Sequence, residues 1–134
     1  MTTRHAACSC GQLSLVTEGA PVRISICHCR ACQRRTGSVF GAQARFPRDQ
    51  VHDITGRRTK YVRVAESGNA VSLFFCPDCG GTLYWELETL PGFIAVAVGC
   101  FADPDFPAPY ISVYEECMHD WLTRAGELKL ERSR

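Results

Sequence analysis

Short stretches of alternating apolar and polar residues make up most of the chain, and glycine, proline and aspartate separate them. This two-residue period is typical of antiparallel β-strands with one buried face. Helical periodicity is nearly absent, apart from one or two turns after Arg30 and a segment around residues 115–122. The predicted strands are residues 12–17, 22–26, 39–46, 59–64, 70–75, 82–87, 93–98 and 110–114.

These elements predict a mainly β fold of packed antiparallel sheets with short helical turns. The 134 residues, of which 46% are hydrophobic, are enough for one core but too few for two ordinary domains. We therefore expect a single domain over residues 1–134, with a core from about residue 5 to residue 123 and a charged C-terminal tail after it.

Charge and hydropathy narrow the function classes. No stretch approaches the roughly 18 apolar residues of a membrane helix, and no apolar run opens the chain, so we expect a soluble, cytoplasmic protein without a membrane partner. Fifteen basic and fourteen acidic residues give a net charge of +1. Such a balance creates no overall field toward nucleic acid, and we expect no nucleic-acid partner.

The nine cysteines are the strongest indication of function in the sequence. Seven of them fall into three tight clusters, at residues 8–10, 27–32 and 76–79. In a reducing cytosol this usage does not indicate a disulfide framework, and the close spacing is that of metal ligands. Seven thiolates divide into a closed tetrahedral zinc site of four and an open site of three, and an open position is typical of catalytic zinc.

The closed site is expected from the first and third clusters. Cys76-x-x-Cys79 followed by glycine is a turn that directs both sulfurs toward one metal, so it supplies half of a tetrahedron. Cys8-x-Cys10, also followed by glycine, could supply the other half. The alternative, small buried cysteines without a metal, is less favoured for both pairs.

The open site is expected from the middle cluster, because Cys27, Cys29 and Cys32 can reach one metal from one side without closing its fourth position. That position is open to water, to a protein group such as His28, or to a substrate sulfur. In an extended segment His28 points to the face opposite its two cysteine neighbours, so it is not the favoured ligand.

Polar residues beside the middle cluster are candidates for substrate contacts. Arg30, Arg34 and Arg35 either form a solvated basic turn or offset thiolate charge and bind substrate carboxylates. Thr36 and Ser38 could donate hydrogen bonds near the site.

Three further residues carry weaker signals. Cys100 and Cys117 lack spaced partners, which favours small buried hydrophobes over ligands or redox thiols. His119 is either a surface residue or, less favoured, a proton shuttle.

Three motifs identify a resemblance. They are CSCG at residues 8–11, CHCRACQRRTGS at residues 27–38 and FCPDCGGTL at residues 75–83. In this order and spacing the sequence resembles the glutathione-dependent formaldehyde-activating enzymes and their relatives, which share a domain with centromere protein V.

The resemblance implies a mainly β zinc-binding domain with two Zn²⁺ per chain. It implies a carbon–sulfur lyase type of chemistry in which a thiol such as glutathione adds to a small aldehyde such as formaldehyde, or the reverse. The alternative is a non-enzymatic, zinc-stabilised protein-interaction module. The implied ligands are Cys8, Cys10, Cys76 and Cys79 for a structural zinc, and Cys27, Cys29 and Cys32 for a catalytic zinc.

Overall fold

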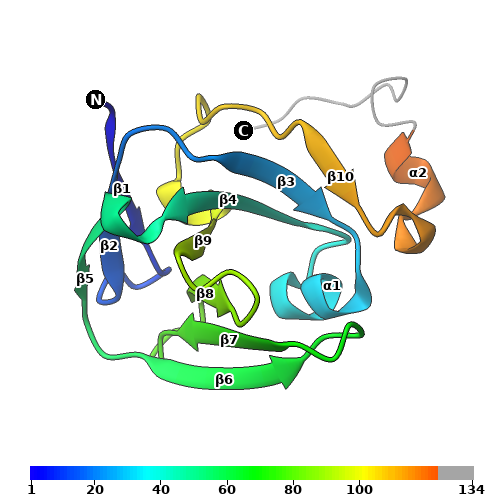
Figure 1. Ribbon diagram of the computed structural model, residues 1–134, viewed down its shortest axis with the longest axis horizontal. Coiled ribbons are helices and arrows are strands. Elements are labelled where there is room, and N and C mark those ends of the chain that lie inside the picture. Colours follow the sequence, from blue (N-terminus) through cyan, green and yellow to red (C-terminus); the bar gives the residue numbers. More distant parts are fainter. Residues whose placement is uncertain (124–134) are drawn as a thin grey trace.

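A computed structural model describes residues 1–123, and within them the chain forms two β-sheets (Figure 1). The smaller sheet has the order β1–β2–β5, and both of its strand pairs are antiparallel. Its strands are β1 (Thr3–Ala7), β2 (Ser14–Glu18) and β5 (Val51–Thr55).

The larger sheet has seven strands in the order β10–β3–β4–β9–β8–β7–β6. Its strand pairs are antiparallel except that β10 runs parallel to β3. The proline-rich loop 103–109 brings β10 back to that edge, and such a loop cannot join a sheet itself because proline lacks the N–H donor. The strands are β3 (Arg23–Cys27), β4 (Gly41–Pro47), β6 (Thr59–Val64), β7 (Ala70–Phe75), β8 (Thr82–Leu87), β9 (Phe93–Ala97) and β10 (Ile111–Val113).

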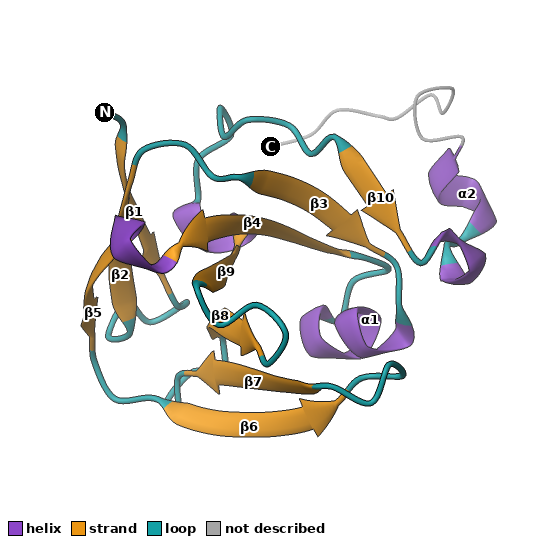
Figure 2. Cartoon of the chain, in the orientation of Figure 1, coloured by secondary structure: helices purple, strands orange, loops and turns teal. Residues whose placement is uncertain are grey.

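The larger sheet curves so that the β3–β4 pair and the β6–β7 hairpin lie on opposite sides of helix α1 (Arg30–Thr36) (Figure 1). The remaining helical segments are one turn or little more, as Figure 2 shows. No helix within residues 1–123 is long and apolar enough to cross a membrane. The short segments are η1 (Arg48–Gln50), η2 (Val98–Phe101), η3 (Glu115–Cys117) and α2 (Asp120–Thr123).

The main core lies between the two sheets. Leu15 of the smaller sheet is 1% exposed, and Phe46 of the larger sheet is fully buried. Full burial of a side chain of this size contributes about 1.5–3 kcal/mol. The buried residues of this core are Ala6, Cys8, Leu13, Leu15, Ile24, Ala44, Phe46, Cys76, Leu83, Tyr84, Ile94, Val96 and Phe101.

The mainly β class is confirmed, and strands β6, β7 and β8 have the predicted bounds. Two strands were not predicted, β1 and β5. The β1 sequence, TRHAA, has weak β propensity, and pairing with β2 holds it in place. In β5 a bulge places Asp53 at a φ of 52°, which interrupts the alternation. The predicted charged tail lies outside the described residues.

Candidate metal centres and an arginine-lined groove

The four-cysteine cluster joins the two sheets. Cys8 and Cys10 follow β1 of the smaller sheet, whereas Cys76 and Cys79 follow β7 of the larger one. Their four sulfur atoms all lie within 4.8 Å of one another. Cys8 and Cys76 are buried and the other two are exposed, so the cluster lies at the edge of the core.

The spacing of these sulfurs fits a zinc ion. The Cys8 and Cys10 sulfurs are 3.7 Å apart, and so are those of Cys10 and Cys76. A tetrahedral zinc with Zn–S bonds of about 2.3 Å places its sulfur ligands about 3.8 Å apart. The turn also has the expected shape, because Gly80 takes a φ of 78° that a residue with a side chain rarely adopts.

Gln12 links this cluster to the turn after β5. Its Nε2 donates to Cys76 Sγ at 3.0 Å and to the Arg57 carbonyl at 2.6 Å, while its Oε1 accepts from the Arg57 N–H at 2.9 Å. Arg57 also pairs with Asp78, whose N–H donates to Cys76 Sγ. Burial opposes ionisation of Cys76, but hydrogen bonds from the Cys79 backbone and Gln12 outweigh it and lower the pKa of this thiol to about 6.

Gly56 lies closely against the backbone of Gln12 and Leu13. Its φ is +110°, and a Cβ at this position would overlap the Gln12 carbonyl and lie 2.9 Å from Leu13 Cα. We expect Gly56→Ala to lower the free energy of unfolding by about 2 kcal/mol or more, because both neighbours are backbone atoms. Thermal and denaturant unfolding measure this. Gly92→Ala, where the added Cβ has no neighbour within 4 Å, is the matched control and should be nearly neutral.

The three-cysteine cluster lies at the junction between β3 and α1. Cys27 ends the strand, Cys29 is the residue that caps the helix N-terminus, and Cys32 lies in its first turn. The Cys29 sulfur accepts the Cys32 N–H at 3.3 Å. This tight strand-to-helix turn places all three sulfurs within 4.8 Å of one another.

Within residues 1–123 no fourth His, Cys, Asp or Glu side chain joins this cluster. His28 points elsewhere, as expected: its ring is buried, lies 6.2 Å from Phe40 and hydrogen-bonds to Ser112. The pKa of Cys32 is lowered to about 5, mainly by a hydrogen bond with Cys27. The same interaction raises the pKa of Cys27. A thiol that ionises readily suits metal binding, which requires thiolates.

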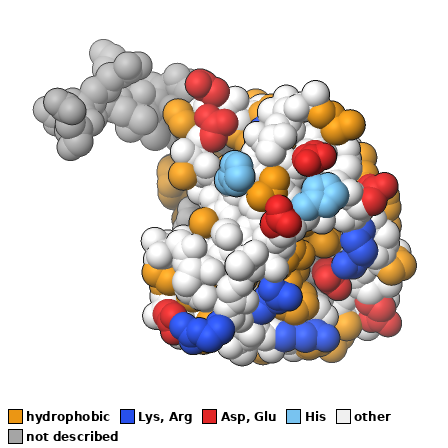
Figure 3. All heavy atoms as spheres, turned by 90° about the vertical axis from the view of Figure 1, so that its left-hand side faces the viewer, with side chains coloured by type: hydrophobic (Ala, Val, Ile, Leu, Met, Phe, Trp, Pro, Cys, Tyr) orange, Lys and Arg blue, Asp and Glu red, His pale blue; other side chains and the backbone are white. Residues whose placement is uncertain are grey.

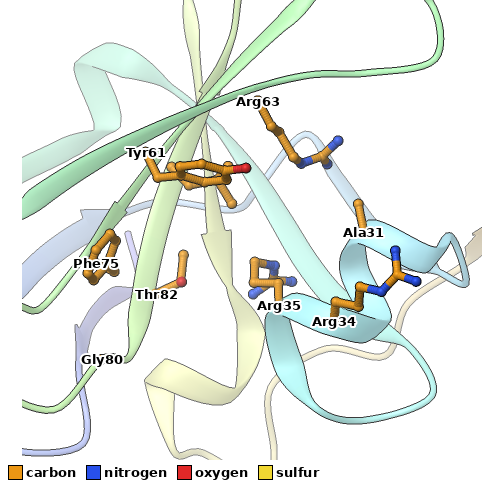
Figure 4. Close-up of a pocket in the computed structure, with 9 residues that line it drawn as sticks. Ala31, Arg34, Arg35, Tyr61, Arg63, Phe75, Gly80 and Thr82 are labelled. Carbon is orange, nitrogen blue, oxygen red and sulfur yellow. The ribbon is translucent and has the colours of Figure 1, made fainter.

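A groove of about 370 Å³ opens beside these cysteines. Arg35 of α1 and Arg63 of β6 line it, and their charges contribute to the lowered pKa of Cys32. The Arg35 guanidinium lies 4.4 Å from the ring centre of Trp85, and this cation–π contact holds the arginine in place. Trp85 also lines the groove. Figure 4 shows an adjoining hollow that Arg35 and Arg63 also line, with Arg63 reaching from β6 toward the start of α1 and Arg35 on the helix opposite.

The residues predicted to contact substrate are divided between different surfaces. Arg30 and Arg35 line the groove, and Arg34 lines, together with Arg35, a neighbouring hollow between α1 and the β6–β7 hairpin. Thr36 and Ser38 lie outside the groove, next to the four-cysteine cluster. The Thr36 hydroxyl donates to the Cys32 carbonyl at 2.9 Å and accepts the Ser38 N–H, so it supports the end of α1.

Three groove arginines were not predicted, namely Arg23 of β3, Arg45 of β4 and Arg63 of β6. The strand period could have indicated one of them: Arg23 and Cys27 are four residues apart and therefore share a face of β3. Cys100 and Cys117 are partly buried and belong to neither cysteine cluster.

Other parts of the surface carry mixed charge. His119 is exposed, and its Nε2 lies 3.3 Å from Gln33 Oε1. On the face that Figure 3 shows, basic and acidic side chains are interspersed, without a continuous patch of one sign. The groove is lined by five arginines and by two glutamates, Glu66 and Glu116, so positive charge predominates there.

Comparison with known proteins agrees with this geometry. The family described as glutathione-dependent formaldehyde-activating enzyme matches residues 3–117, which contain both cysteine clusters. A crystal structure of a Rhodobacter sphaeroides protein has the same fold, with a TM-score of 0.62 and 18% identity over 81% of this chain and 99% of that one. No curated protein matches the chain significantly in sequence. Since the family match extends over most of the chain, the protein belongs to the glutathione-dependent formaldehyde-activating enzyme family.

Proposed function

We propose that this protein is a zinc-dependent enzyme that adds a thiol, glutathione or a similar compound, to formaldehyde or another small aldehyde. Formally this is a carbon–sulfur lyase reaction in reverse. The observation that carries the proposal is a cluster of three cysteine sulfurs with no fourth ligand among the described residues, beside an arginine-lined groove. The family description supports glutathione and formaldehyde as the reactants.

The residues suit this chemistry. Cys27, Cys29 and Cys32 would hold a zinc ion, which supplies a Lewis acid beside which a substrate thiol ionises at neutral pH. Arg35 and Arg63 add positive charge on the groove side, where it favours an anionic sulfur and the oxyanion that develops on the aldehyde.

The reaction balances without another reactant. A bond forms between the thiol sulfur and the carbonyl carbon, the carbonyl π electrons move to oxygen, and that oxygen gains one proton for the one that the thiol lost. The groove brings both reactants together, so the step becomes effectively intramolecular.

The test is the rate of exchange between free formaldehyde and S-hydroxymethylglutathione, followed by NMR with ¹³C-labelled formaldehyde. We expect an acceleration in proportion to protein concentration, which disappears when zinc is removed. An unchanged rate with two zinc ions bound per chain would contradict the proposal and favour the zinc-stabilised interaction module.

A further inference from the structure

Two arginines of the groove face each other without a partner. Arg23 of β3 and Arg45 of β4 are directly opposite in the strand register, and both line the groove. Among the residues that the structure describes, neither takes part in an ion pair. The Arg23 Nε is buried and has no hydrogen-bond partner.

Such a pair is unfavourable by itself. Like charges directly opposite on neighbouring strands repel each other, and a buried guanidinium N–H without an acceptor loses its hydration. Burial and the neighbouring Arg23 charge both lower the pKa of Arg45. An anion bound between the two side chains would remove the repulsion and satisfy the free Arg23 Nε–H, so the pair has the properties of an anion-binding site.

The pair lies at a defined distance from the three-cysteine cluster. Arg23 and Cys27 share one face of β3 and are four residues apart, which places their Cα atoms about 13 Å from each other. Gln43 of β4 lies opposite Ser25, midway between Arg23 and Cys27 along the strand pair. It lines the groove, and its Oε1 is buried without a hydrogen-bond partner. A free acceptor thus lies between the arginine pair and the sulfurs.

We propose that Arg23 and Arg45 form the subsite that binds a carboxylate of the thiol substrate. The groove then selects an anionic thiol of peptide length, with the carboxylate on the arginines, an amide N–H on Gln43 Oε1 and the sulfur at the three cysteines. A small neutral thiol would occupy only the end of the groove at the three cysteines and would not contact the arginine pair. This inference rests on the proposed function, because it takes the thiol to bind at the three-cysteine cluster.

Calorimetry of the zinc-loaded protein with reduced glutathione and with its diethyl ester tests the subsite, because the ester keeps the thiol and loses both carboxylate charges. We expect the wild-type protein to bind glutathione about tenfold or more tightly than the ester, since each charge-assisted hydrogen bond contributes that much. Arg45→Gln should remove this preference and leave the affinity for the ester within about twofold.

The matched control is Arg58→Gln, at an exposed arginine outside the groove, which should keep the wild-type preference. Zinc content and melting temperature confirm that each variant is folded. If Arg45→Gln does not fold, Arg23→Gln tests the same subsite. Equal affinities for glutathione and ester in the wild type, or an unchanged preference in the folded variant, would overturn the proposal.

The two proposals fail separately. Catalysis of the exchange reaction without a preference for the charged thiol would overturn only the arginine subsite. A charge preference that Arg45→Gln removes, in a protein that does not accelerate the exchange, would support the subsite and contradict the enzymatic function.

Discussion

Replacing Cys29 by serine is expected to abolish thiol–aldehyde condensation while the protein stays folded. The variant leaves only Cys27 and Cys32 at the open site, and a serine hydroxyl remains protonated at neutral pH, so it is a poor zinc ligand. Metal-ion catalysis contributes several kcal/mol, which corresponds to a loss of about 10³-fold or more in rate. Helix α1 should persist, because Cys29 is its N-cap and serine is among the preferred N-cap residues.

The rate of formaldehyde exchange and the zinc content, measured by elemental mass spectrometry, check this expectation. We expect one zinc ion per chain in the variant and two in the wild type. Cys100→Ser is the matched control, because Cys100 is partly buried, belongs to neither cluster and lies outside the groove. Full activity in a Cys29→Ser protein that binds a single zinc would rule out the three-cysteine cluster as the catalytic centre.

Cys76→Ser is expected to have the largest effect on stability. Cys76 is fully buried, and its sulfur accepts hydrogen bonds from Gln12 and from the Asp78 N–H. The cluster connects the two sheets, so loss of a zinc ion held there would remove one of the links between them, in addition to the shared core. The binding energy of a structural zinc is folding energy, and we expect a loss of about 5 kcal/mol or more.

For a chain of this size, such a loss corresponds to a fall in melting temperature on the order of 15 °C or more. Scanning calorimetry together with zinc content measures it. Cys100→Ser is a suitable control, because Cys100 is partly buried, its sulfur lies 3.5 Å from the Thr82 carbonyl, and a hydroxyl can make the same hydrogen bond. A Cys76→Ser protein that melts near the wild-type temperature would show that this cluster has no structural role.

Much of the candidate site could be predicted because its ligands are local. Cys27, Cys29 and Cys32 lie within six residues, and Cys76 and Cys79 share one turn, so each group can reach a metal whatever the surrounding fold. The combination of the first and third clusters was also predictable, because each pair supplies only half of a tetrahedron. Strands bounded by turn residues, such as β7 and β8, were predictable from the alternation alone.

The groups that surround these cysteines could not be read from the sequence, because they come from distant parts of the chain. Arg23, Arg45 and Arg63 come from three strands and line one groove because the seven-stranded sheet curves around α1. Strands β1 and β5 likewise depend on pairing with β2 rather than on their own sequence preference. Cysteine spacing and strand alternation are local properties, so the β class and the two cysteine groups that could hold a metal follow from the sequence. The groove and its charge depend on long-range strand pairing, which no local pattern specifies.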